Sequence, residues 1–133
     1  GMLSCIDPSG RGDLSGKPIW VNKDIGRSIS TPSVDGDLIY QAEYRGDIHC
    51  IDAKSGKQVW VYETNSRVWS STLVADGKVY CGTEDGELVI LKAGRELELI
   101  GKPEFFTPIN CTPVVANDAI YVTTQTHLFA VGR

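Results

Sequence analysis

The chain has 133 residues, of which 41% are hydrophobic and 23% are charged, and its formal net charge is −4. A chain of this length and composition can bury the core of a single domain. The acidic balance and the lack of any run of lysine or arginine argue against nucleic acid or an anionic membrane surface as the main partner. No apolar stretch approaches the roughly 20 residues of a membrane-spanning helix, so we expect no direct membrane span.

Taken in chain order, the sequence reads as a succession of short strands. Residues 3–24 contain two segments typical of strands, residues 28–64 and 68–104 contain four each, and residues 109–133 contain three. Asp-Gly or Asn-Asp pairs precede the second strand of the last three units, where a tight hairpin needs positive φ. No segment sustains a helical period long enough to cross over between parallel strands, so we expect antiparallel pairing.

The units repeat at a fixed spacing. Trp20 and Trp60 stand 40 residues apart, and Tyr40, Tyr80 and Tyr121 follow one another at 40 and 41 residues. Four-stranded antiparallel units with this period are typical of the blades of a β-propeller. We therefore predict an all-β fold, with residues 1–133 forming a single β-propeller segment of about three blades. Complete propellers close with about 4–8 blades, so a larger propeller, or one built from more than one chain, is expected.

The turn between the third and fourth strands carries the most specific motif. The segment IDAKSGKQVW resembles the tryptophan-docking motif of the pyrroloquinoline-quinone-type (PQQ-like) repeat. A glycine in such a turn admits positive φ, and a large ring at the end of the outer strand can cover the neighbouring blade while its N–H finds a backbone acceptor. In a third copy, Ile100 stands where the tryptophan would be, and we expect its truncation to cost about 2–4 kcal/mol, less than that of Trp60. The residues assigned to this motif are Asp52, Gly56 and Trp60, with Gly16 and Trp20 in a looser copy.

The resemblance implies a function as well as a fold. It points to the non-catalytic branch of the PQQ-like propellers, which resembles the outer-membrane-protein assembly factor, and so to a scaffold that binds a protein partner in the periplasm or cell envelope. The alternative is the C-terminal fragment of a PQQ-dependent dehydrogenase. Those enzymes resemble one another in a vicinal disulfide and a calcium site, and this chain has four cysteines but no adjacent pair. A structural fragment without a function of its own is the third possibility.

The sequence offers no clear catalytic, cofactor or metal site. His49 and His127 lie far from any cluster of cysteines, and no spacing points to a nucleophile with its base. Asp47, Glu43 and Glu84 fall at predicted turns or strand ends, where a solvated surface charge is expected. We therefore predict no enzymatic activity, no cofactor and no metal ligands.

A partner-binding face is predicted from the propeller geometry. Loops that lead into the innermost strands and loops that join the second and third strands should emerge on one face. Arg27 and Arg67 are equivalent in the repeat, and Tyr44, Arg45 and Trp69 should lie beside them. Arginine with aromatic residues is the composition of a binding hot spot. In the alternative interpretation the arginines pair with carboxylates and Trp69 packs between blades.

Open sheet edges are expected at both ends of the segment. Unpaired backbone N–H and C=O groups invite pairing with another chain, so we predict a homodimer. In the predicted dimer, the strand around Trp20 of one chain completes the blade that ends at Val131 of the other. An open arc is the alternative.

Overall fold

The computed structural model describes residues 1–132, which contain strands and turns but no helix, and hence no helix able to cross a membrane. Four antiparallel sheets contain two, four, four and three strands. The first sheet is β1 (Leu3–Cys5) and β2 (Trp20–Asn22), and the second is β3 (Ser33–Asp35), β4 (Leu38–Ala42), β5 (Asp47–Asp52) and β6 (Gln58–Glu63). The third is β7 (Leu73–Ala75), β8 (Lys78–Gly82), β9 (Leu88–Lys92) and β10 (Leu99–Gly101), and the fourth is β11 (Val114–Ala116), β12 (Ala119–Thr123) and β13 (Leu128–Gly132).

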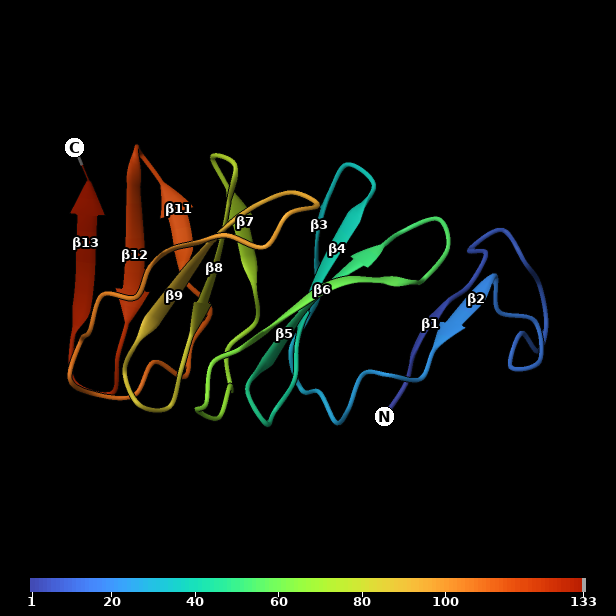
Figure 1. Ribbon diagram of the computed structural model, residues 1–133, viewed down its shortest axis with the longest axis horizontal. Coiled ribbons are helices and arrows are strands. Elements are labelled where there is room, and N and C mark those ends of the chain that lie inside the picture. The colour runs from blue at the N-terminus through green and yellow to red at the C-terminus, as the bar shows by residue number, and fades with distance from the viewer. Residues whose placement is uncertain (133) are drawn as a thin grey trace.

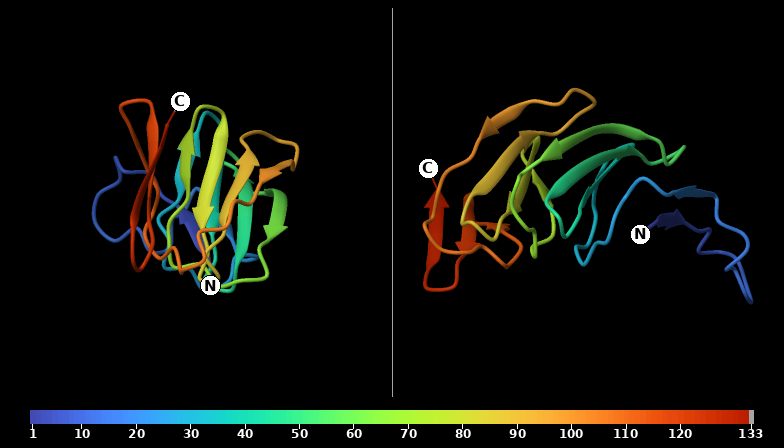
Figure 2. Two further views of the ribbon diagram at one scale, coloured as in Figure 1. Left: turned by 90° about the vertical axis from the view of Figure 1, so that its left-hand side faces the viewer. Right: turned by 60° about the horizontal axis from the view of Figure 1, so that its bottom comes forward.

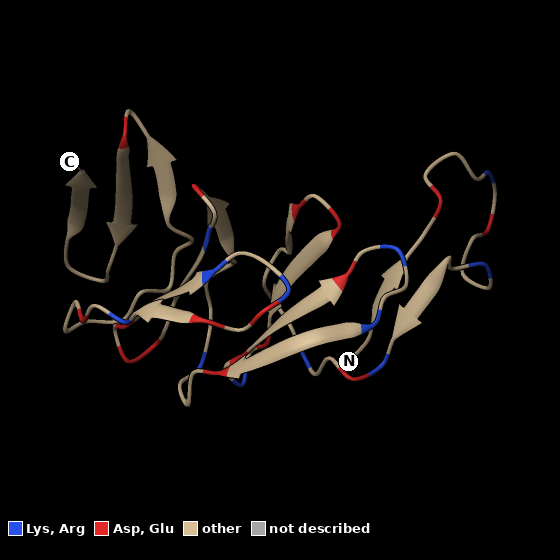
Figure 3. Ribbon diagram, turned by 45° about the horizontal axis from the view of Figure 1, so that its top comes forward, with Lys and Arg blue, Asp and Glu red and all other residues tan. Residues whose placement is uncertain are grey.

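The sheets stand side by side along an arc, from β1 and β2 at one end to β13 at the other (Figure 1). The curvature of the arc is plain in the right-hand view of Figure 2. Each four-stranded sheet is a meander in which consecutive strands are hydrogen-bonded neighbours. Charged residues of both signs gather mainly in the turns and at strand ends (Figure 3). The predicted all-β fold of four-stranded antiparallel blades is confirmed.

The first hairpin of these blades turns through residues with positive φ. Asp76 and Gly77 have φ of 49° and 67°, and Asn117 and Asp118 have φ of 51° and 59°. Two successive residues in this region form a type I′ turn, whose twist matches that of the flanking strands. These two pairs therefore lie where the strands reverse. In the second sheet, Gly36 follows the end of β3 with a φ of 55°.

The main core lies between the second and third sheets. Side chains from β4, β5 and β6 pack there against side chains from β8 and β9. Tyr40 is fully buried in this core, and its hydroxyl accepts a hydrogen bond from the backbone N–H of Gly94 at 2.8 Å. A smaller apolar cluster around Ile109 and Val122 joins the third sheet to the fourth. Packing between blades, as well as within them, therefore holds the arc together.

Two tryptophans tie one sheet to the next. The indole Nε1–H of Trp20 donates to the carbonyl of Ala53 at 2.8 Å, and that of Trp60 donates to the carbonyl of Gly94 at 2.9 Å. The ring of Trp20 lies so close to Gly56 that a β-carbon there would overlap it, and Gly56 has a φ of 70°. Each ring thus docks on the turn between the third and fourth strands of the following sheet.

Asp52 holds the turn that receives Trp20. Its Oδ1 accepts hydrogen bonds from the backbone N–H and the hydroxyl of Ser55, both at 2.9 Å. Its Oδ2 accepts from the Arg95 guanidinium at 2.6 Å, across the junction with the third sheet. The hydrogen bond from Arg95, followed by those from Ser55, holds the pKa of Asp52 well below its usual range.

Gly16 and Ile100, the two other residues compared with this motif, do not take part in such a docking contact. Gly16 has open space where a ring would sit, since no neighbouring group lies within 4 Å of the position of a β-carbon. Ile100 is 48% exposed, which is too open for the loss of about 2–4 kcal/mol expected from its truncation. The physical reason is that β11–β13, the sheet beyond it, has no fourth strand among residues 1–132, and so offers no turn to receive a ring.

The outer edge of the fourth sheet is unpaired in the described part of the chain. β13 pairs only with β12, and Leu128 and Val131 are 66% and 52% exposed. Such an edge can accept another strand. The homodimer stays a prediction, which light scattering over a range of protein concentrations would test.

Candidate functional site

Loops and turns from all the larger sheets gather on one face of the arc. The turns that join β4 to β5, β8 to β9 and β12 to β13 lie at the lower edge in Figure 1, beside the segments that lead into β3, β7 and β11. The backbone N–H of Tyr44 donates to the carbonyl of Arg27 at 2.9 Å, and that of Glu84 donates to the carbonyl of Arg67 at 2.8 Å. The repeat thus places equivalent residues at equivalent points of this face.

Four side chains on this face form the arginine–aromatic cluster, which consists of Arg27, Tyr44, Arg67 and Trp69. The guanidinium carbons of Arg27 and Arg67 lie 5.5 and 5.7 Å from the centre of the Tyr44 ring. The Trp69 ring meets the same ring edge-on, with centroids 5.0 Å apart and an angle of 86°. Tyr44 is therefore the centre of the cluster, with two cation–π contacts and one aromatic contact.

The cluster is open to solvent. Trp69 is 44% exposed, its Nε1–H donates to Glu84 Oε2 at 3.2 Å, and both arginines are exposed. Among residues 1–132, neither Arg27 nor Arg67 forms an ion pair. The structure therefore does not support the alternative interpretation, in which the two arginines pair with carboxylates. Arg45, also predicted for this face, is exposed in the β4–β5 turn, but its guanidinium lies over none of the described rings.

A second group of polar side chains lies buried beside the first. Glu43, expected as a solvated surface charge, is only 5% exposed, and His49 is 4% exposed. Glu43 Oε1 accepts a hydrogen bond from the Gly26 backbone N–H at 2.5 Å and lies 2.7 Å from His49 Nε2. His49 Nδ1 lies 3.1 Å from Gln58 Oε1, and Asp47 is half-buried. The expectation for Glu43 is wrong because the segment before β3 covers this side of the turn.

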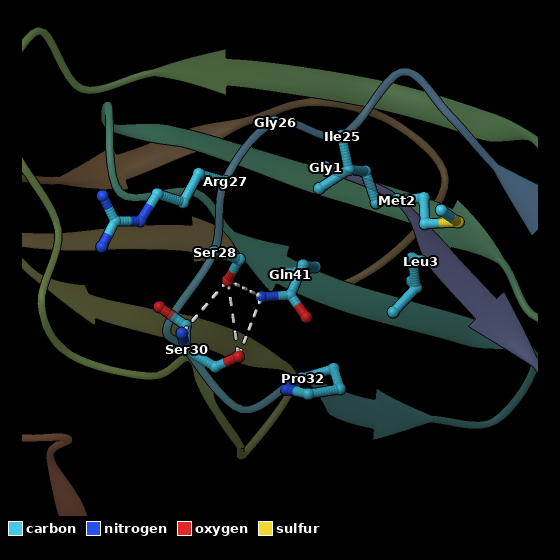
Figure 4. Close-up of a pocket in the computed structure, with 10 residues that line it drawn as sticks. All are labelled: Gly1, Met2, Leu3, Ile25, Gly26, Arg27, Ser28, Ser30, Pro32 and Gln41. Atoms are coloured by element: carbon cyan, nitrogen blue, oxygen red, sulfur yellow. Dashed lines mark hydrogen bonds between the residues drawn. The ribbon is translucent and has the colours of Figure 1, made fainter.

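A cleft of about 570 Å³ opens beside the segment between β2 and β3, as Figure 4 shows. The amide of Gln41 points to its wall and donates to Ser28 Oγ at 2.6 Å and to the carbonyl of Ser30 at 3.1 Å. The Ser28 hydroxyl donates to the Ala42 carbonyl at 2.6 Å, so its proton faces a carbonyl oxygen and no base. The polar side chains of this cleft are therefore bonded to one another and to the backbone.

A comparison with protein families matches residues 1–97 to the PQQ-like family described as outer membrane protein assembly factor BamB. The chain belongs to this PQQ-like repeat family. It is 31% identical over 102 residues to the assembly factor BamB of Burkholderia pseudomallei, across 74% of this chain and 26% of that protein. It is 30% identical over 89 residues to the quinoprotein ethanol dehydrogenase of Pseudomonas aeruginosa, across 65% of this chain and 14% of that protein.

A solved structure shares the fold of this chain. The crystal structure of BamB from Moraxella catarrhalis matches with a TM-score of 0.76 and 24% identity, across 87% of this chain and 38% of that chain. The predicted PQQ-like propeller fold is thus confirmed. The chain spans only a minor part of the length of these relatives, which include both an assembly factor and a dehydrogenase.

The cysteines of this PQQ-like chain are free thiols. Cys50 and Cys81 are buried, and burial raises the pKa of Cys50 to about 11 and that of Cys81 to about 12. Thiols with such pKa values are protonated at neutral pH and are poor nucleophiles. Cys5 is half-buried and Cys111 is exposed. The two buried thiols act as small apolar side chains of the blade packing.

Sequence reasoning missed the buried pair of Glu43 and His49. The signal that could have found it is a break in the repeat pattern. Val89 in β9 and Phe129 in β13 occupy the position that His49 occupies in β5, so a polar ring replaces an apolar side chain facing the preceding sheet. A buried polar residue at an otherwise apolar repeat position requires a partner, and the turn residue Glu43 is near enough to be that partner.

Proposed function

We propose that this chain is a non-enzymatic β-propeller module that binds a protein partner through the arginine–aromatic cluster, as part of a larger bacterial cell-envelope protein. The observation that carries the proposal is the exposed Trp69 packed against Tyr44, beside two arginines that lack carboxylate partners among residues 1–132. Tyrosine, tryptophan and arginine dominate binding hot spots because each combines a large apolar area with polar groups that can form hydrogen bonds.

The cluster is organised before any partner binds. Backbone hydrogen bonds fix Tyr44 against the Arg27 carbonyl, and the Val68 N–H donates to the Tyr44 carbonyl at 3.1 Å. Fixed side chains lose less conformational entropy on binding than mobile ones. Two guanidinium groups on one ring favour a partner segment that brings a carboxylate, because arginine binds carboxylates through two parallel hydrogen bonds.

The envelope assignment rests on the family. The matched family and the Burkholderia relative are described as outer membrane protein assembly factors. Those words apply to the relatives, and they support a scaffold role and a periplasmic or envelope location for this chain. The runner-up is a fragment of a quinone-dependent dehydrogenase, favoured by the 30% identity to the Pseudomonas enzyme.

Site-specific crosslinking tests the proposal. A photo-crosslinking residue would replace Trp69 in the full protein, and a matched one would replace Val34, which is 63% exposed on β3, away from the cluster. We expect a specific protein adduct from position 69 and none from position 34. Reversing the charge with Arg27→Glu and Arg67→Glu should abolish the adduct, whereas Arg45→Glu should reduce it less. Equal adducts from both positions, or an adduct insensitive to the charge reversal, would contradict the proposal.

A binding measurement distinguishes the proposed function from the alternative, a fragment of a quinone-dependent dehydrogenase. The purified chain mixed with pyrroloquinoline quinone and Ca²⁺ should show neither a bound-quinone absorbance nor dye-coupled oxidation of ethanol. Stoichiometric quinone binding at micromolar concentration would favour the dehydrogenase fragment instead.

A further inference from the structure

We propose that Glu43, Asp47 and His49 form a binding site for a divalent transition-metal ion at the turn between β4 and β5. Each side chain offers one ligand atom, and these atoms all lie within 4.8 Å of one another. The site does not depend on the proposed partner-binding role. It uses one imidazole nitrogen and two carboxylate oxygens, a mixed donor set that occurs in metal centres of proteins.

The backbone of the hairpin brings the three ligands together. The Glu43 N–H donates to the Asp47 carbonyl at 2.8 Å, which makes these two residues neighbours across the turn. His49 lies two residues after Asp47 on β5, and alternate residues of a strand point to the same face. All three side chains therefore project from one face of a rigid hairpin.

The environment of His49 suits a metal ligand. Its Nδ1 lies 3.1 Å from Gln58 Oε1, and a proton on Nδ1 would donate to that oxygen. Its Nε2 lies at hydrogen-bonding distance, 2.7 Å, from Glu43 Oε1. A metal ion bound to both atoms would replace the proton of this hydrogen bond. Metal-binding histidines characteristically donate their other N–H to such an acceptor.

The charges around the site also favour a cation. No lysine or arginine forms an ion pair with either carboxylate among residues 1–132. The Gly26 N–H fixes the orientation of the Glu43 carboxylate. A divalent ion would neutralise two carboxylates that otherwise repel each other.

The donor set selects the class of metal. Imidazole favours Zn²⁺, Co²⁺ or Ni²⁺ over Ca²⁺ and Mg²⁺, while two carboxylates also accommodate Mn²⁺. Asp47 is half-buried, so the ion can enter from solvent and water can fill the remaining positions. Tyr44 lies in the same turn, between two of the three ligands. A bound ion would therefore fix the loop that carries the centre of the arginine–aromatic cluster.

Titration with Co²⁺ tests the site, because its visible absorption reports bound nitrogen and oxygen ligands. The protein would first be stripped with a chelator, with Cys5 and Cys111 replaced by serine to remove competing thiols. We expect one Co²⁺ per chain, at least tenfold weaker binding in His49→Gln and Asp47→Asn, and unchanged binding in His127→Gln, in which the replaced histidine is exposed. Displacement by Zn²⁺ should remove the absorption.

Asp47→Asn guards against unfolding as the cause of lost binding, because its side chain is half-exposed and the shape is kept. Its circular dichroism and melting temperature in chelator should match those of the parent, while the Co²⁺ spectrum is lost. Two outcomes overturn the proposal. One is a parent chain that binds no Co²⁺ at millimolar concentration, and the other is binding that is equal in the parent, His49→Gln and Asp47→Asn.

Discussion

The junction between the first and second sheets differs in chemistry from the junction between the second and third, although the repeat places equivalent residues at both. Gln41, Glu43 and His49 face the first sheet, and all three are buried. One repeat later, Cys81 and Val89 occupy the positions of Gln41 and His49, and they belong to the main apolar core. The same backbone thus supports a hydrogen-bonded junction and a mainly apolar one, provided that every buried polar group has a partner.

The largest effect is expected from the apolar junction. Trp60→Ala should lower the free energy of unfolding by about 3–5 kcal/mol, because it leaves a cavity beside Tyr40 and removes the bond to Gly94. Chemical denaturation measures the loss, with Trp69→Ala as the matched variant of an exposed ring. A Trp60 variant as stable as the parent would show that the ring does not hold the blades together.

One substitution should disrupt the polar junction, and a second should make it resemble the apolar one. His49→Val alone should cost about 1–3 kcal/mol, because Glu43 stays buried without its partner. Adding Glu43→Thr should recover most of the loss, since the pair then copies Thr83 and Val89 of the third sheet. There, Thr83 Oγ1 accepts from the Glu87 N–H at 3.1 Å and satisfies the turn. Denaturation of the single and double variants is the measurement, and additive losses would contradict the comparison.

The rim of the apolar junction carries a pH-dependent contact. The pKa of Asp52 is held down by the hydrogen bond from Arg95, so its stabilisation is present above the usual carboxyl pKa of about 4 and is lost as the pH falls below it. Asp52→Asn should therefore be less stable than the parent at pH 7, and the difference should shrink as the medium is acidified. Melting temperatures of both proteins, measured between pH 7 and pH 2, test whether the difference in stability shrinks as the pH falls. A difference that does not change with pH would contradict a contribution from the charge of Asp52.

The smallest effect is expected at Ile100. Because the side chain is 48% exposed, Ile100→Ala should cost less than about 1 kcal/mol, in contrast to its repeat counterpart Trp60. The two variants measured in the same denaturation series give the comparison directly. A loss as large as that of Trp60→Ala would mean that another strand or chain covers Ile100 in solution.

The repeat made the fold predictable because its signals are local. Turn pairs such as Asp76–Gly77 set the hairpins, and the strand pattern fixed which residues are equivalent. The equivalence of Arg27 and Arg67 predicts that both lie on one face, and both guanidinium groups lie over the Tyr44 ring. Burial of Glu43 could not be predicted in the same way. The break in the repeat at His49 points to a partner for that ring. The contact of Glu43 with the segment before β3, 17 residues away in sequence, has no such local signal.

The docking of Trp20 and Trp60 gives the arc a direction. Each ring extends from an outer strand to a turn of the following sheet. The second sheet therefore receives a tryptophan ring on one side and supplies one on the other. An interface of this head-to-tail kind either continues or closes into a ring. Blades joined in this way behave as interchangeable units: a duplicated blade inserted between two others would meet a complementary surface on both sides, whereas an inverted blade would meet none.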